Sequence, residues 1–128
     1  MADKHIIRTD RAPLPIGPYN QAVMWDNLLF ISGQIALHPD TGKLMTDDIH
    51  TETKQVMENI GAILEAAGLN FSHVVKATIY LTDMSSFPVV NEVYGQYFDE
   101  TTAPARETVQ VAHLPKDVHV EISAIAIK

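Results

Sequence analysis

The sequence predicts a domain in which helices pack on a sheet, either an α+β or an α/β sandwich. Segments with the two-residue alternation of strands surround two segments with helical spacing, in the order strand-strand-strand-helix-strand-helix-strand-strand. Such an order allows helices to cover the apolar face of one sheet. The chain has 128 residues, enough to bury one hydrophobic core, so we expect residues 1–128 to form a single domain.

The first third of the chain is expected to be mostly strand. Residues 4–9 predict a short strand, and residues 11–19 form a connector whose prolines exclude a helix or a central strand. Residues 20–25 and 28–36 predict the next two strands. They flank Asp26 and Asn27, a plausible two-residue hairpin turn.

Two helices are expected in the middle of the chain. Apolar residues recur with helical spacing after three capping candidates at residues 46–48, and Gly68 is a natural stop. Residues 73–82 alternate as a strand. Residues 85–100 predict a second helix, with Pro88 in its first turn.

The last two strands carry two charged residues, Arg106 and Glu121. Alternation predicts that both lie on one polar face; this face would comprise Arg106, Thr108, Gln110, Glu121 and Ser123, and the opposite face Val109, Val111, Val118, Val120, Ile122 and Ala124. A plain hairpin about residues 114–117 would leave Arg106 about 13 Å from Glu121. Charges on a strand face are usually solvated, so the two residues alone are more often surface charges than a functional pair.

Composition limits the classes of function. The net charge is −7 and the nine Lys and Arg residues form no cluster, which argues against a nucleic-acid surface and favours small molecules or protein partners. The chain has no cysteine, so thiolate chemistry is absent. Residues 1–10 lack the apolar core of a signal peptide, and no apolar run approaches membrane-spanning length. We therefore expect a soluble, cytoplasmic protein without a membrane partner.

Standard catalytic and metal-binding motifs are mostly absent. No Gly-rich loop has phosphate-binding spacing, and the six histidines show no paired metal-ligand spacing. Ser32 lacks the surroundings of a nucleophile elbow, and a Ser-Gly pair at a strand end is more often a bulge or bend. These motifs alone leave the function of the domain open.

A longer pattern is more specific. The motifs "GPY", "SGQ", "PAR" and "LPKD.H.EI.AIA" occur in this order, within the segments "IGPYNQAV", "LLFISGQIALHPDTGKL", "ILEAAGL", "VVKATIYLTDMSSFPVVNEVYGQYF" and "PARETVQVAHLPKDVHVEISAIAI". From about Ile6 to its end, the chain resembles the RidA/YjgF family, the reactive intermediate deaminases, also known as L-PSP endoribonucleases or translation inhibitors. No single motif would be specific.

The resemblance implies a particular fold and assembly. Members have a chorismate-mutase-like fold, a six-stranded mixed sheet with two helices on one face, and form homotrimers with clefts between subunits. Their sheet order separates the last two strands, with the Arg106 strand at an edge and the Glu121 strand further in. We therefore expect this arrangement in place of the plain hairpin.

The resemblance also implies a reaction. Members hydrolyse enamines and imines, such as 2-aminoacrylate, 2-iminopropanoate and 2-iminobutanoate, to 2-keto acids and ammonia, without a cofactor or a metal. Arg106 and Glu121 match the family's catalytic residues: guanidinium would bind the substrate carboxylate in two-pronged fashion, and the glutamate would orient or activate a water. The remaining substrate-binding matches are Tyr19, Ser32, Gly33, Asn91 and Thr108. Many relatives carry cysteine in place of Thr108, so here only a hydroxyl is offered.

Two other functions remain open. Some relatives are named endoribonucleases or translation inhibitors, but the acidic balance of this chain counts against RNA. Others are non-catalytic ligand-binding trimers that lack the arginine, so the presence of Arg106 favours catalysis.

Overall fold

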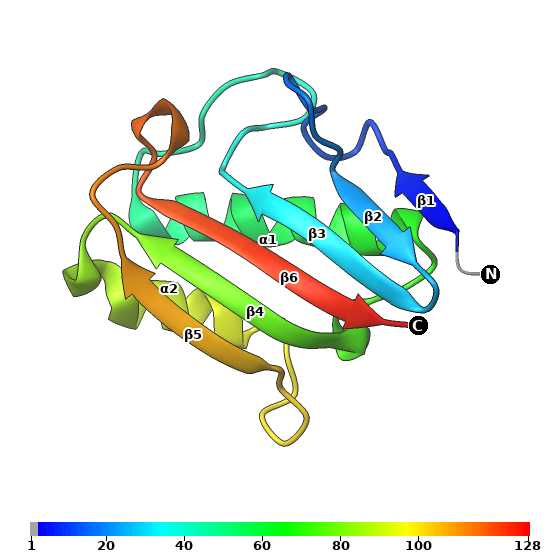
Figure 1. Ribbon diagram of the computed structural model, residues 1–128. Coiled ribbons are helices and arrows are strands. Elements are labelled where there is room, and N and C mark those ends of the chain that lie inside the picture. Colours follow the sequence, from blue (N-terminus) through cyan, green and yellow to red (C-terminus); the bar gives the residue numbers. More distant parts are fainter. Residues whose placement is uncertain (1–2) are drawn as a thin grey trace.

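The computed structural model describes residues 3–128 and contains one six-stranded sheet with both α-helices packed behind the same face (Figure 1). The strands are β1 (Lys4–Ile7), β2 (Ala22–Trp25), β3 (Leu28–Gln34), β4 (Val74–Leu81), β5 (Ala105–Gln110) and β6 (Val120–Ile127), and the helices are α1 (Ile49–Ala66) and α2 (Phe87–Gly95). Across the sheet the order is β1-β2-β3-β6-β4-β5. Among the strands of residues 3–128 only the β4–β5 pair is parallel, so the sheet is mixed, as expected.

Local signals in the sequence correctly placed the β2–β3 hairpin and the ends of α1. Asp26 has a φ of 57°, the left-handed conformation that a two-residue hairpin turn requires. The Asp48 side chain accepts a hydrogen bond from the Thr51 N–H at 2.7 Å and caps α1. Gly68, with a φ of 76°, follows the last turn of α1 and ends the helix.

The second helix is shorter than residues 85–100. A 3₁₀ turn at Met84–Ser86 precedes α2, Pro88 lies in the first turn as expected, and the helix ends at Gly95. Beyond it, the Tyr97 and Phe98 rings pack on Phe71, with ring centroids 5.1 and 5.5 Å apart respectively. Since these contacts bury aromatic surface that a continued helix would direct elsewhere, tertiary packing overrides the local helical pattern.

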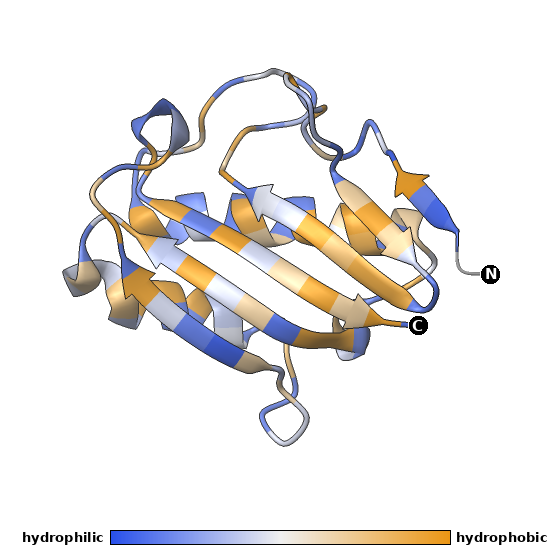
Figure 2. Cartoon of the chain, viewed as in Figure 1, coloured by the Kyte–Doolittle hydropathy of each residue, from blue (hydrophilic) through white to orange (hydrophobic). Residues whose placement is uncertain are grey.

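The core lies between the sheet and the helices, and the other face of the sheet is open. Leu29, Ile79 and Ile122 are completely or almost completely buried on the helix side. On the open face, Trp25 is 48% exposed and Phe30 is 43% exposed. Figure 2 shows that apolar residues occur along most strands of the sheet, and their exposed members, such as Trp25 and Phe30, belong to the open face. An apolar sheet face of this kind usually marks an interaction surface.

Strand register corrects the expectation that Arg106 and Glu121 share a face. Ile79 of β4 is buried under the helices and pairs with Thr108 of β5 and with Ile122 of β6. Thr108 and Arg106, two residues apart, therefore lie on the helix face, whereas Glu121, next to Ile122, lies on the open face. Alternation within each strand was predicted correctly, but the prediction of which face each set of residues occupies relative to the other strand was wrong. That relation is set by pairing with β4, which alternation within the strands does not reveal.

The separation of the last two strands agrees with the resemblance. β4 lies between β5 and β6, and β5 forms an edge of the sheet (Figure 1). The plain hairpin is thereby excluded. Within residues 3–128, neither α-helix combines the length and apolar character needed to cross a membrane.

Candidate active site

Arg106 is held on the helix face of β5 by side chains from α2. Its Nη1 donates a hydrogen bond to Asn91 Oδ1 at 2.7 Å. The guanidinium carbon lies 5.4 Å from the centre of the Phe87 ring and 5.0 Å from that of the Tyr94 ring. These distances are typical of cation–π contacts. The side chain is thus oriented by one hydrogen bond and two rings.

The charge of Arg106 has no carboxylate partner in the part of the chain that the structure describes. The salt bridges among residues 3–128 involve Arg11, Lys76 and His119, and none involves Arg106. The side chain is also exposed. A pre-oriented guanidinium without a partner is suited to bind an incoming carboxylate through the donors that Asn91 leaves free.

Two buried hydroxyls lie on the elements that hold Arg106. Thr108 Oγ1 and the Tyr94 hydroxyl are both buried without a hydrogen-bond partner within residues 3–128. Burial raises the pKa of Tyr94, against the opposing effect of the Arg106 charge, so the phenol remains neutral. Thr108 points to the same side of β5 as Arg106.

Glu121 forms a second cluster, on the open face of the sheet. The pairing of β3 with β6 is irregular between Ile31 and Gln34, and Gly33 lies in this bulge. A Cβ built at Gly33 would lie 2.8 Å from Glu121 Cδ, so only glycine leaves room for the carboxylate. Glu121 is half-buried, and desolvation raises its pKa above that of an ordinary glutamate. A carboxylate with this property is suited to take up and release a proton closer to neutral pH.

The connector before β2 brings Tyr19 to a hollow that Gly33, the neighbour of Glu121, also lines. A hollow of about 260 Å³ is lined by Tyr19, Gly33 and Lys116 among others. Ser32 Oγ donates a hydrogen bond to the Asn20 carbonyl at 2.6 Å, so this hydroxyl holds the connector in place. Ser32 therefore supports the loop that carries Tyr19, and its hydroxyl oxygen keeps its acceptor capacity.

Sequence reasoning missed two residues of the Arg106 cluster and one residue that supports the connector. Phe87 and Tyr94, with Asn91 between them, follow i, i+4, i+7 spacing on α2, and this spacing was the available signal that they share a face. Gln21 is buried and donates hydrogen bonds to the carbonyls of Ala12 and Pro13 at 3.1 and 2.8 Å. It thereby fixes the proline-rich connector, and no local pattern distinguished it from a surface glutamine.

The two clusters do not meet within one chain. The Arg106 cluster lies on the helix face and comprises Arg106, Phe87, Asn91, Tyr94 and Thr108; the Glu121 cluster lies on the open face and comprises Glu121, Gly33 and Tyr19. β4 separates the two strands, which places them two strand spacings, about 10 Å, apart in addition to the sheet between their side chains. Each chain therefore carries two half-sites.

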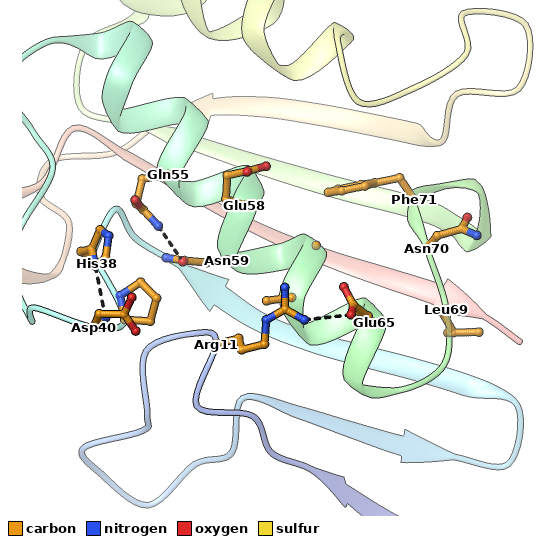
Figure 3. A pocket seen from close by; sticks show the side chains of 13 residues that line it. Arg11, His38, Asp40, Gln55, Glu58, Asn59, Glu65, Leu69, Asn70 and Phe71 are labelled. Carbon is orange, nitrogen blue, oxygen red and sulfur yellow. Dashed lines mark hydrogen bonds and ion pairs between the residues drawn. The ribbon is translucent and has the colours of Figure 1, made fainter.

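A larger hollow, of about 610 Å³, lies beside α1 and is lined by none of the half-site residues (Figure 3). Its polar side chains pair with one another: Arg11 Nη1 contacts Glu65 Oε1 at 2.8 Å, and Gln55 Nε2 donates to Asn59 Oδ1 at 2.9 Å. Its only arginine is thus already neutralised by a carboxylate, unlike Arg106. Within residues 3–128, no group of three or more His, Asp or Glu side chains is placed to hold a metal ion.

The fold and the half-sites define a class: an α+β protein in which one face of the sheet carries a free guanidinium and the other a desolvated carboxylate. The family model described as Endoribonuclease L-PSP matches residues 9–128. The chain belongs to this family, the RidA/YjgF proteins, and the resemblance read from the sequence is confirmed.

Three relatives illustrate the match. A RutC family protein of Pyrococcus horikoshii is 54% identical over 125 residues, which cover 98% of this chain and 98% of that protein. The 2-iminobutanoate/2-iminopropanoate deaminase of Bos taurus is 50% identical over 125 residues, covering 98% of this chain and 90% of that protein. The crystal structure of E. coli TdcF with bound serine has a TM-score of 0.91 and 47% identity, covering 97% of this chain and 98% of that chain.

Proposed function

We propose that this protein is an imine deaminase, which hydrolyses 2-iminobutanoate and 2-iminopropanoate to 2-keto acids and ammonia. The observation that carries the proposal is the guanidinium of Arg106, oriented by Asn91 and two rings and without a carboxylate partner in residues 3–128. The substrates share a carboxylate next to the C=N carbon, which a planar guanidinium binds in a fixed orientation. Relatives at about 50% identity carry the name of this activity.

The proposed chemistry assigns one proton shuttle to Glu121. With the carboxylate of an iminium substrate on Arg106, a water attacks the C=N carbon, and its proton passes to Glu121 as a carbinolamine forms. Glu121 returns this proton to the amino nitrogen, the C–N bond breaks, and ammonia leaves. The hydroxyl proton is lost to the solvent or to ammonia as the keto group forms. The products are one keto acid and one ammonium ion, and atoms and charge balance without a cofactor.

The proposal requires a second copy of the chain at each site. Arg106 and Glu121 lie on opposite faces, so the Arg106 cluster of one copy is completed by the Glu121 cluster of its neighbour. The exposed apolar residues of the open face, such as Trp25 and Phe30, favour association of copies through this face. We propose a homotrimer with a cleft at each subunit boundary, because cyclic closure covers this face in every copy.

A coupled assay tests the reaction. A threonine dehydratase generates 2-iminobutanoate, semicarbazide traps it, and the rate of trapping is followed by absorbance. We expect the protein to suppress trapping and to release 2-ketobutanoate, and Arg106→Ala to leave trapping unchanged. Full trapping in the presence of the folded parent protein would overturn the proposal. Cleavage of RNA by the parent in a parallel incubation would favour the endoribonuclease alternative instead.

A further inference from the structure

Glu52 connects helix α1 to the strand end that bears Glu121. Its side chain is completely buried in the first turn of α1. Oε2 accepts hydrogen bonds from the backbone N–H groups of His119 and Val120 at 2.7 and 2.8 Å, and Oε1 lies 2.7 Å from His119 Nδ1. A buried carboxylate is costly unless its oxygens are satisfied, and here two backbone N–H groups donate to one oxygen while the His119 ring contacts the other.

All three contacts are to the two residues that precede Glu121. The pairing of β3 with β6 ends at Gln34 and Ile122, so β3 offers no partner to the strand end before Ile122. Two backbone donors at this strand end find their acceptor in Glu52 and not in a neighbouring strand. Glu52 thus anchors the backbone of β6 directly before Glu121.

The conformation of the loop before this strand end explains why the backbone needs an anchor here. Lys116 and Asp117 have φ values of 56° and 55°, in the left-handed region that side chains other than glycine rarely adopt. A chain that enters β6 from such a turn tends to relax unless its next segment is anchored. The Glu121 carboxylate lies against Gly33 of β3, so its place in the bulge depends on where this strand end lies. A small shift of the strand end would therefore move it out of place.

We propose that Glu52 is a positioning residue for Glu121: its carboxylate anchors the backbone of His119 and Val120 and so fixes the Glu121 carboxylate in the bulge of β3. The proposal rests on the proposed function, in which Glu121 activates the water. Glu52 makes no contact with substrate in this account. The anchoring depends on the length of the Glu52 side chain, which reaches two backbone N–H groups, and not on its negative charge.

Three substitutions separate reach from charge. Glu52→Gln keeps the length and one acceptor oxygen, Glu52→Asp keeps the charge but is one methylene shorter, and Glu52→Ala removes both. We expect the glutamine variant to retain most of the parent kcat, and the aspartate and alanine variants to lose about ten- to a hundredfold, as for a misplaced catalytic group. KM should change little, because Arg106 on β5 binds the substrate carboxylate. Thr53→Val serves as the control, since it removes a hydrogen bond within α1, from Thr53 Oγ1 to the Ile49 carbonyl, and leaves the Glu52 carboxylate in place.

A second measurement does not depend on activity. The Glu121 carboxyl is titrated by carbon-13 NMR and assigned by its loss in Glu121→Gln. We expect its raised pKa to move toward that of an ordinary glutamate in Glu52→Asp and Glu52→Ala, but to stay in place in Glu52→Gln and Thr53→Val. If Glu52→Ala does not fold, the aspartate variant decides. Lower thermal stability with unchanged kcat and unchanged Glu121 titration would overturn the proposal, as would a fully active aspartate variant beside an inactive glutamine variant. Absence of imine hydrolysis by the parent would instead contradict the proposed function, and the titration would still test the anchor.

Discussion

Replacing Arg106 with lysine keeps a positive charge but removes the planar, two-pronged contact with a carboxylate. In the parent, one edge of the guanidinium is occupied by Asn91 at 2.7 Å, and the Phe87 and Tyr94 rings hold its orientation. The remaining N–H groups are free for two parallel bonds to a carboxylate. An ammonium has no such plane and does not stack on the rings in the same manner.

The expected loss in kcat/KM corresponds to one hydrogen bond to the substrate carboxylate. A hydrogen bond to a charged group contributes about 1.5–3 kcal/mol. At about 1.4 kcal/mol for each factor of ten, losing one bond lowers kcat/KM by about ten- to a hundredfold. Arg106→Ala should abolish measurable hydrolysis. Because the side chain is exposed and outside the core, neither variant should change the melting temperature by more than a few degrees.

The assay is the semicarbazide-coupled rate over a range of dehydratase activity, with keto-acid binding measured by calorimetry. Arg11→Lys is the matched control, since Arg11 is also exposed but its charge is already paired with Glu65 at 2.8 Å. It should retain parental activity. If Arg106→Lys works as well as the parent, Arg106 is only a general positive charge, and the reasoning from its geometry is wrong.

The remaining predictions concern the Glu121 half-site and the assembly. Glu121→Gln should lower kcat by about a hundredfold or more and preserve keto-acid binding, since glutamine cannot carry the proton; parallel loss of both would indicate a structural role. Burial raises the pKa of Glu121, so parental kcat/KM should fall as pH drops through this pKa, and the variant should lack this acid limb. The effect on stability has the opposite direction, because the ionised form of Glu121 bears the cost of desolvation. Glu121→Gln should therefore raise the melting temperature at pH values above this pKa and leave it unchanged below about pH 4. An equal effect in both pH ranges would contradict the assignment. Gly33→Ala should reduce kcat because its Cβ would displace the carboxylate, and an unimpaired variant would show that the bulge does not constrain it. Sedimentation should show a trimer, and a stable monomer at micromolar concentration would exclude the shared cleft.

Local chemistry made part of this fold predictable from the sequence. Asp48 and Gly68 bound α1 because capping and left-handed termination depend on adjacent residues alone. The Asp26 turn follows for the same reason. The order of the last two strands came from the family resemblance, because a chain read strand by strand favours the simple hairpin.

The relation between the half-sites was not predictable from alternation. Arg106 and Glu121 each occupy a polar position of an alternating strand, yet pairing with β4 places them on opposite faces. Phe87 and Tyr94 resembled ordinary core residues, and their contact with Arg106 depends on how α2 lies across the edge strand. Such relations arise from long-range packing, which one sequence does not encode in any local pattern.

The central claim is that each site combines Arg106 of one copy with Glu121 of another, and mixed assembly tests it directly. Arg106→Ala and Glu121→Gln proteins, each inactive alone, are mixed at equal amounts, unfolded and refolded together. In a cyclic assembly with random mixing, a boundary has both intact residues with probability one half times one half, so activity should return to about a quarter of the parent. Recovery near this level would support the shared site. A mixture of well-formed mixed assemblies that remains inactive would contradict it.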